Sequence, residues 1–282
     1  MSIRDKKIAI IGLGMLGGSY AQGFYEAGMK TTGIDIDPKA IRYAKEHHWI
    51  GDGGDDPSLI KDCDIVISAL YPQAFIDWIR LHQQCFKSGA ILSDVTGVKR
   101  KVIEEINGIL RPDVEYIACH PMAGREYKGI AYADPSQFAQ ANFLIVPTEK
   151  NSQQAIETAK EIADLLKFKT ISLIDPEEHD RIIGFVSQLC HVIAVSLMNI
   201  SDDPKLTDYT GDSFRDLTRI ADINEDLWPE LFIYNKDNLL KEIGQLISQL
   251  EEMSELIREE DIDRMKEKMI IATIRRRQFS RH

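Results

Sequence analysis

Long apolar runs are scarce in this sequence, and no stretch approaches the roughly eighteen consecutive apolar residues of a membrane-spanning helix. No signal peptide precedes the first expected strand. The four cysteines include no CxxC pair, and their spacing fits neither a zinc site nor a disulfide framework. The net charge of −11 argues against nonspecific nucleic-acid binding. We therefore expect a cytoplasmic protein with no metal site, whose partners include neither membranes nor nucleic acid.

A glycine-rich segment near the start of the chain carries the clearest signal. The apolar run 8–11 leads into Gly12, Gly14 and Gly17, a helical pattern follows, and a second apolar run ends at Asp35. This is the dinucleotide-binding fingerprint in its strand–turn–helix–strand context. The helix N-terminus offers free N–H groups to a pyrophosphate. A carboxylate at the end of the second strand accepts hydrogen bonds from a ribose and repels a 2′-phosphate, which predicts NAD rather than NADP.

Further strands and helices alternate up to about residue 173, which predicts a mostly parallel sheet covered by helices on both faces. In such sheets, ligands bind at the carboxyl ends of the strands. Four loops follow strand ends, at 12–17, 69–72, 94–99 and 120–124, so we expect them to meet in one crevice. The residues predicted to contact the cofactor are Gly12, Gly14, Met15, Leu16, Gly17, Asp35, Ala69 and Leu70.

The remainder of the chain has helical periodicity and no convincing strand. We therefore predict an α/β protein with a Rossmann domain at 1–173 and an all-α domain at 174–282. Apolar residues in the second domain recur at alternating spacings of four and three, which is typical of a helix that packs along one seam. Because this half is too small to bury much core alone, we expect a homodimer formed through it. The seam consists of Leu239, Ile243, Leu246, Leu250, Met253 and Ile257.

Five motifs, in this order along the chain, resemble the prephenate dehydrogenases of tyrosine biosynthesis, a family that includes arogenate dehydrogenases. They are GLGMLGGS at 12–19, DVTGVK at 94–99, HPMAGRE at 120–126, SQLCH at 187–191 and FRDLTRIADINEDLW at 214–228. The resemblance implies a Rossmann domain, a helical dimerisation domain and a site between them. It also implies the reaction, which is NAD-dependent oxidative decarboxylation of prephenate to 4-hydroxyphenylpyruvate.

The resemblance assigns roles to individual residues. His120 matches the family's catalytic histidine, and an imidazole titrates near working pH, as a group that takes up a hydroxyl proton should. Arg219 matches the arginine for the ring carboxylate, where a guanidinium fork suits bidentate binding. His191 matches a second site histidine. Trp228 matches a tryptophan that either walls the substrate site or fills core.

Several positions depart from the family pattern. Gln188 stands where the family often has a histidine, and Gly97 where it often has a serine beside the catalytic histidine. Thr96 could supply that hydroxyl from one position earlier. We also expect Arg125 or Lys128, which follow the HPMAG motif, to contact the pyruvyl carboxylate of the substrate, either within one subunit or across the dimer. The predicted substrate-binding set is Thr96, Gly97, Arg125, Gln188 and Trp228.

Three alternatives remain open from the sequence. An arogenate dehydrogenase would need an acidic group near the amino end of its substrate, and Asp180 and Glu126 are possible positions. A 3-hydroxy acid dehydrogenase would need a catalytic lysine in the helical half, where no lysine lies in a matching motif. The non-enzymatic alternative is a regulatory protein that binds NAD.

Overall fold

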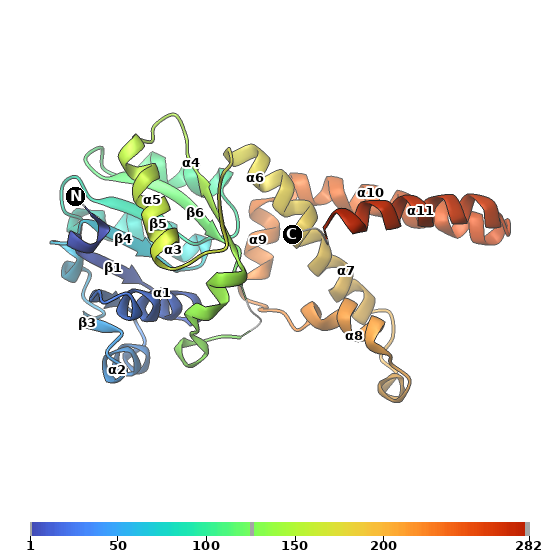
Figure 1. Ribbon diagram of the computed structural model, residues 1–282, viewed down its shortest axis with the longest axis horizontal. Helices are drawn as coiled ribbons and strands as arrows, with labels where there is room; N and C mark the ends of the chain where they lie inside the picture. The colour runs from blue at the N-terminus through green and yellow to red at the C-terminus, as the bar shows by residue number, and fades with distance from the viewer. Residues whose placement is uncertain (1, 125–126, 280–282) are drawn as a thin grey trace. The chain divides into compact units, whose positions relative to one another are not determined.

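A single sheet organises the first part of the molecule. The structure is a computed structural model that describes residues 2–124 and 127–279, and within them eight strands pair in the order β3-β2-β1-β4-β5-β6-β7-β8 (Figure 1). Neighbouring strands are parallel except β6 and β7, which are antiparallel. The strands are β1 Ile8–Ile11, β2 Thr31–Ile34, β3 Ile50–Gly54, β4 Ile65–Ser68, β5 Ile91–Asp94, β6 Glu115–Pro121, β7 Asn142–Val146 and β8 Thr170–Leu173.

Helices cover both faces of the sheet, because side chains of successive strand residues alternate between the faces. Ile8 and Ile10 of β1 pack in a core with α1, α2 and α5, whereas Ala9 and Ile11 pack in a second core with α3 and α4. These helices are α1 Met15–Glu26, α2 Pro38–Glu46, α3 Pro72–His82, α4 Arg100–Ile109 and α5 Gln153–Leu165. The predicted mostly parallel sheet with helices on both faces is therefore confirmed.

The edge strand β3 was not expected from the sequence. Its residues are IGDGG, and beyond Ile50 they are exposed or half-buried. A strand with so little apolar alternation is held by pairing with β2 rather than by burial, so the sequence pattern carries no signal for it.

After β8, every regular element in the described residues is helical. Asp175 caps α6 by accepting from the N–H of Glu178, and Pro176 occupies the first turn, as the sequence predicts. The elements are α6 Pro176–Ile183, the π-helical turn η6 Gly184–Gln188, α7 Leu189–Met198, the 3₁₀ turn η7 Pro204–Asp208, α8 Asp212–Thr218, the 3₁₀ turn η8 Arg219–Ala221, α9 Trp228–Tyr234, α10 Lys236–Arg258 and α11 Ile262–Gln278.

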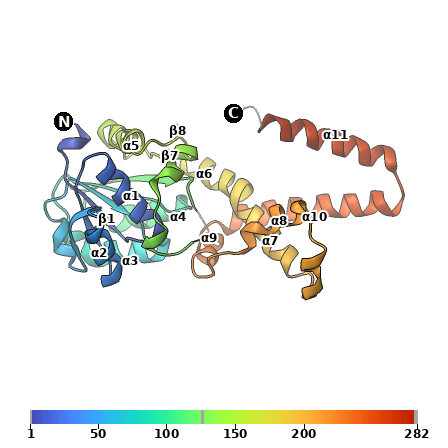
Figure 2. The ribbon, with the colours of Figure 1, turned by 60° about the horizontal axis from the view of Figure 1, so that its bottom comes forward.

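Helices α6 and α7 continue through η6 as one helix, Pro176–Met198 (Figure 2). By length and composition alone this helix could cross a membrane, which the sequence analysis did not anticipate. Its buried polar side chains His179, Asp180 and Gln188 nevertheless hydrogen-bond to other segments of the same compact unit. These contacts make it a structural helix of the domain.

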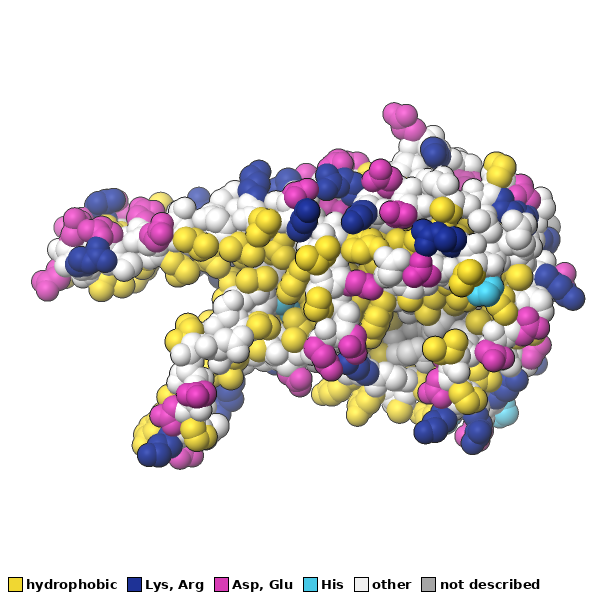
Figure 3. All heavy atoms as spheres, turned by 180° about the vertical axis from the view of Figure 1, so that it is seen from behind, with side chains coloured by type: hydrophobic (Ala, Val, Ile, Leu, Met, Phe, Trp, Pro, Cys, Tyr) yellow, Lys and Arg dark blue, Asp and Glu magenta, His cyan; other side chains and the backbone are white. Residues whose placement is uncertain are grey.

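The chain divides into two compact units, residues 1–236 and 237–282, so that α6 to α9 belong with the sheet. The domain boundary predicted near residue 173 stays a prediction. In the second unit, the ammonium of Lys268 on α11 bonds to Glu252 and Gln249 on α10. Figure 3 shows hydrophobic side chains gathered along these helices. Those exposed by about half or more are Leu240, Ile247, Leu250, Ile257, Ile262, Met269, Ile270, Ile271 and Ile274.

Candidate functional site

The candidate site is a cavity of about 420 Å³ inside the first unit. Its walls come from the carboxyl ends of the strands on one side, and on the other from the helical segment 183–191 and from residues 222–231, a loop that leads into α9. The loops at 12–17, 69–72, 94–99 and 120–124 each contribute to it, as the parallel topology predicts. Of the sequence-predicted site residues, those that line the cavity are Gly14, Met15, Leu16, Ala69, Leu70, Thr96, Gly97, His120, Gln188, His191 and Trp228.

The glycine loop at one end of this cavity has the geometry expected for a dinucleotide site. Gly12 has φ +86°, a conformation that favours glycine. A Cβ on Gly17 would lie 1.8 Å from the carbonyl oxygen of Gly12, so the helix can approach the loop only without a side chain there. A Cβ on Gly14 would meet no atom within 4 Å, and no side chain caps α1. The open space at the helix N-terminus fits a phosphate group.

Asp35 supports that loop from the end of β2. One carboxylate oxygen accepts from the N–H of Leu13 at 2.6 Å, and the other accepts from the N–H of Asp37 at 2.8 Å. The carboxylate is therefore fixed beside the glycine loop, where its remaining lone pairs can accept from ribose hydroxyls.

His120 lies near the end of β6, where the strand opens into the cavity. Its Nδ1 is 2.9 Å from Nε2 of His179, a fully buried side chain on α6. His179 in turn places its Nδ1 2.8 Å from a carboxylate oxygen of Asp180. Asp180 also accepts from the backbone N–H groups of Lys99 and Arg100, so it holds the start of α4. The result is a buried chain of polar side chains that ends at the cavity.

Burial lowers the pKa of His120 well below the usual histidine value, and the nearby His179 and Lys99 lower it further. Burial also lowers the pKa of His179, an effect that the hydrogen bond to Asp180 opposes. Both imidazoles are therefore neutral at pH 7. A neutral imidazole at the cavity wall can accept a proton.

Sequence reasoning missed His179 and gave Asp180 another role. The sequence contains no spacing that links His179 to His120, because 59 residues separate them and only the packing of α6 against β6 joins them. Asp180 was considered as an acidic group near the substrate. That interpretation is wrong in this structure, because Asp180 is buried behind His179 and does not line the cavity.

Thr96 and Gly97 lie on the cavity wall next to His120. The Thr96 hydroxyl bonds to Asp94 at the short distance of 2.5 Å and lies 3.0 Å from the carbonyl oxygen of Val98. The expectation that it serves His120 is therefore not met, because the hydroxyl is committed to the strand end beneath the wall. At Gly97, a Cβ would lie 3.8 Å from Nε2 of His120, so the missing side chain leaves that nitrogen accessible.

The opposite wall is formed where η6 passes into α7. A π-helical turn inserts an extra residue into the helix, and such turns are frequent at functional sites. Here Ser187, Gln188 and His191 all line the cavity, although His179, about two turns earlier, faces β6. The ring of His191 stacks on Trp228 with centroids 3.6 Å apart, and its Nδ1 lies 3.0 Å from the carbonyl oxygen of Ser187.

Gln188 is buried and both ends of its amide are occupied. The nitrogen donates to the carbonyl of Leu231 on α9, and the oxygen accepts from the side chain of Asn235, each at 2.8 Å. In this chain the residue that replaces the family's histidine therefore ties the π-helical turn to α9. A contact with substrate stays a prediction.

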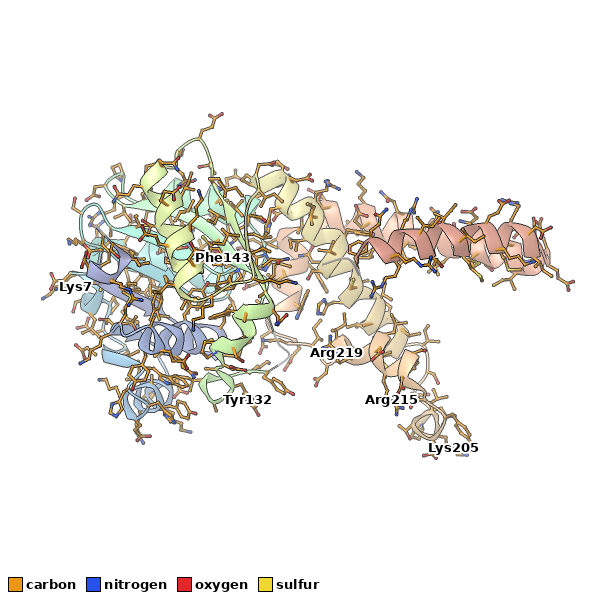
Figure 4. The ribbon with its side chains drawn as sticks, viewed as in Figure 1. Lys7, Tyr132, Phe143, Lys205, Arg215 and Arg219 are labelled. Carbon is orange, nitrogen blue, oxygen red and sulfur yellow. The ribbon has the colours of Figure 1, made fainter. Side chains whose placement is uncertain are left out.

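Of the predicted cationic side chains, the structure describes Arg219 and Lys128. Arg219 lies in η8, at the end of α8, where its side chain is exposed, and it is not among the cavity-lining residues (Figure 4). Asp222, three residues later, does line the cavity, so the carboxylate-binding role of Arg219 stays a prediction. Arg125 lies outside the described residues. Lys128 lines the cavity, and its ammonium is 3.2 Å from the carboxylates of Glu225 and Asp226.

Comparisons with known proteins agree with this architecture. Residues 21–172 match the family described as "Prephenate dehydrogenase, nucleotide-binding domain", and residues 175–270 match "Prephenate dehydrogenase, dimerization domain". The prephenate dehydrogenase of Bacillus subtilis is 27% identical over 269 residues, which span 92% of this chain and 72% of that protein. The cyclohexadienyl dehydrogenase of Zymomonas mobilis is 26% identical over 92% of this chain and 90% of its own length.

Solved structures give the same result. The prephenate dehydrogenase of Aquifex aeolicus, in complex with hydroxyphenyl propionate and NAD⁺, superposes with a TM-score of 0.89 at 27% identity over 97% of this chain and 98% of that one. The arogenate dehydrogenase of Synechocystis shares the fold, with a TM-score of 0.83 at 23% identity over 97% of this chain and 99% of that one. The two family matches together account for most of the chain, which therefore belongs to the prephenate dehydrogenase family, oxidoreductases of tyrosine biosynthesis with a nucleotide-binding domain and a helical dimerisation domain.

Proposed function

We propose that this chain is an NAD-dependent prephenate dehydrogenase that produces 4-hydroxyphenylpyruvate, with His120 as its catalytic base. One observation carries the proposal. The imidazole of His120 and the first turn of α1, Gly14–Leu16, line the same cavity, so a nicotinamide bound on the glycine loop would lie beside the base. Two relatives named prephenate dehydrogenase align over 92% and 91% of this chain, and they support prephenate as the substrate.

The protein's own groups fit a dinucleotide. The open space beyond Gly14 and the start of α1, which no side chain caps, can receive the pyrophosphate, and Asp35 can accept from the ribose hydroxyls. Bound NAD⁺ would supply the acceptor for a hydride. The Aquifex aeolicus structure, which contains NAD⁺, supports this cofactor.

The reaction requires the protein to bind prephenate, to orient its ring toward the nicotinamide and to remove the proton of its ring hydroxyl. As the hydride leaves the hydroxyl-bearing ring carbon of prephenate, Nε2 of His120 takes the hydroxyl proton and a carbonyl forms. The bond to the ring carboxylate then breaks, CO₂ leaves, and the electron pair of that bond makes the ring aromatic as a phenolate. The proton held on Nε2 of His120 then returns to the phenolate oxygen and gives 4-hydroxyphenylpyruvate. Stacked on Trp228, His191 can hold the substrate against the opposite wall. Arg219 is the proposed partner of a substrate carboxylate.

The second candidate substrate is arogenate, and one observation favours it. Asp222 lines the cavity, and a carboxylate there could pair with the ammonium group that arogenate has and prephenate lacks. The two substrates are otherwise alike at the reacting ring, so His120 would serve either one.

We further propose that the protein is a homodimer. The match to a family dimerisation domain supports this assembly, as do the large apolar side chains exposed on α10 and α11. Of the predicted seam, Leu250 and Ile257 are among these exposed side chains, whereas Leu239 is buried.

Steady-state kinetics with each substrate and each cofactor test the proposal directly. Formation of reduced nicotinamide from prephenate and NAD⁺ should exceed that from arogenate or with NADP⁺ by at least about tenfold in kcat/KM. A higher kcat/KM for arogenate would identify arogenate as the substrate instead of prephenate. A higher value with NADP⁺ would identify NADP⁺ as the cofactor instead of NAD⁺. A protein that binds NAD⁺ yet turns over neither substrate would be the regulatory alternative.

A further inference from the structure

The hydrogen bonds behind His120 determine which of its nitrogens carries the proton. Both carboxylate oxygens of Asp180 accept from backbone N–H groups, so they act as acceptors here and Nδ1 of His179 donates to one of them. A neutral His179 then has a bare Nε2, which must accept from Nδ1 of His120. The remaining nitrogen of His120, Nε2, is left with a lone pair next to Gly97, on the wall of the cavity.

We propose that His179 and Asp180 are positioning residues that hold His120 in the tautomer whose unprotonated Nε2 faces the cavity. This inference rests on the proposed function in one respect, because the proposed reaction supplies the proton that this nitrogen accepts. The pair acts through His120 and touches neither substrate nor cofactor, because both side chains are buried and neither lines the cavity.

The position of Asp180 is itself fixed from three directions. The backbone N–H groups of Lys99 and Arg100 donate to its two carboxylate oxygens, at 2.8 and 3.0 Å. Its own carbonyl oxygen accepts from the side chain of Asn235 at 2.8 Å. A carboxylate held in this way cannot rotate to receive a proton donor from elsewhere, so the direction of the hydrogen-bond chain is set.

The group that orients the His120 ring lies on the side of the ring away from the cavity. Gly97 has no side chain, and the Thr96 hydroxyl is committed to Asp94. Among the described residues, the His120 ring hydrogen-bonds to the side chain of His179. Without it, the ring could adopt either tautomer, and in one of them Nε2 carries a hydrogen and cannot accept the hydroxyl proton.

The same chain stabilises the product of proton transfer. When Nε2 takes the hydroxyl proton, His120 becomes an imidazolium whose Nδ1–H still points to the neutral His179, and the carboxylate of Asp180 lies behind it. The ammonium of Lys99 also lies close to the two imidazoles, and it is paired with the carboxylate of Asp94. The carboxylate of Asp180, behind His179, therefore helps to balance the positive charge formed at His120.

Nitrogen NMR of ¹⁵N-histidine-labelled protein tests the tautomer without any substrate. In the wild-type protein near pH 7.5, the His120 ring, assigned by its loss in His120→Asn, should show a protonated Nδ1 and an unprotonated Nε2. A protonated Nε2 would overturn the proposal. Because this result does not depend on turnover, the proposal and the assigned function can fail separately: absence of turnover with prephenate and arogenate would refute the function alone.

Two substitutions at His179 separate the two hydrogen bonds. The amide of His179→Gln reaches the place of Nε2 and offers an oxygen to His120, whereas His179→Asn reaches only the place of Nδ1 and Asp180. We expect His179→Asn to lower kcat about 100-fold and to give a mixture of His120 tautomers. His179→Gln should keep the wild-type tautomer and stay within about tenfold of the wild-type kcat.

The KM for NAD⁺ should be unchanged in both variants, since a fold defect would raise it. The matched control is His82→Gln, the same exchange on α3 at a histidine that does not line the cavity. If His179→Asn kept both the wild-type tautomer and the wild-type kcat, the proposal would be wrong. Should that variant not fold, the wild-type spectrum still decides, because a protonated Nε2 of His120 contradicts the proposal.

Discussion

The ammonium of Lys99 lies 2.6 Å from a carboxylate oxygen of Asp94, and neither side chain is exposed to solvent. The same carboxylate accepts from the hydroxyl of Tyr116 at 2.9 Å and from the backbone N–H of Cys119 at 3.1 Å. The pair therefore joins the end of β5 to β6 directly beneath the cavity wall. Its neighbours satisfy the remaining lone pairs of Asp94, which is the condition under which a buried ion pair is tolerated.

Removing one member of this pair should destabilise the fold strongly. We expect Lys99→Met to lower the free energy of unfolding by about 3–5 kcal/mol, because the Asp94 charge would stay buried without its partner. Urea denaturation measures the difference. The control is Lys87→Met, which breaks the more exposed pair with Asp64, also 2.6 Å long, and should cost at most about 1 kcal/mol. Equal losses in the two variants would contradict this assignment.

The activity should persist to lower pH than an ordinary histidine base would allow. Because burial lowers the pKa of His120 well below 6.5, its neutral form dominates down to that lower pKa. The acid limb of kcat/KM against pH should therefore lie below pH 6.5. His120→Asn should lower kcat about 10²- to 10⁴-fold without changing NAD⁺ affinity. An acid limb at or above pH 6.5 would show that another group controls the rate.

Stability should fall in acid for the same reason. His120 and His179 have lowered pKa values in the folded protein, so the unfolded chain binds more protons once the pH drops below about 6.5. Their contribution to stability is complete above that pH and is lost as the pH decreases toward the folded-state pKa values. The unfolding free energy of His179→Gln, followed by urea denaturation from pH 8 to 5, should depend less steeply on pH than that of the wild type.

Asp35 should set the choice between NAD⁺ and NADP⁺. Its carboxylate is held by the N–H groups of Leu13 and Asp37, so it cannot move aside for a 2′-phosphate. Asp35→Asn removes the charge but keeps an oxygen that can accept from Leu13. We expect this variant to reduce the ratio of kcat/KM for NAD⁺ over NADP⁺ by about tenfold or more, mainly through a lower KM for NADP⁺. An unchanged ratio would place the discrimination elsewhere.

What could be predicted from the sequence depended on whether the determining contacts were local. The glycine loop is a local device, because its turn, its close helix approach and its free N–H groups arise within a few residues, and all are present in the structure. The convergence of loops on one cavity followed from parallel topology alone. His120 could be placed on the wall because it lies near the carboxyl end of a mostly buried strand.

The positioning groups could not be predicted, because their contacts join distant parts of the chain. His179 meets His120 only after α6 packs against β6, and Asp180 meets Lys99 across 81 residues. Thr96 shows that a local contact can also escape prediction. Its hydroxyl could bond either to Asp94 or to His120, and the sequence does not reveal that it donates to the carboxylate of Asp94 at the end of the strand.

The exposed apolar faces of α10 and α11 lead to a prediction about assembly. We expect Ile274→Asp, at a side chain that is 57% exposed on α11, to weaken the proposed homodimer, because the interface would lose a buried isoleucine and gain a charge. Each isoleucine contributes about 1.5–3 kcal/mol to the free energy of association, and in a twofold dimer this contribution is lost twice. Sedimentation over a range of protein concentrations measures the dissociation constant. A wild-type protein that is monomeric at micromolar concentration would rule the dimer out.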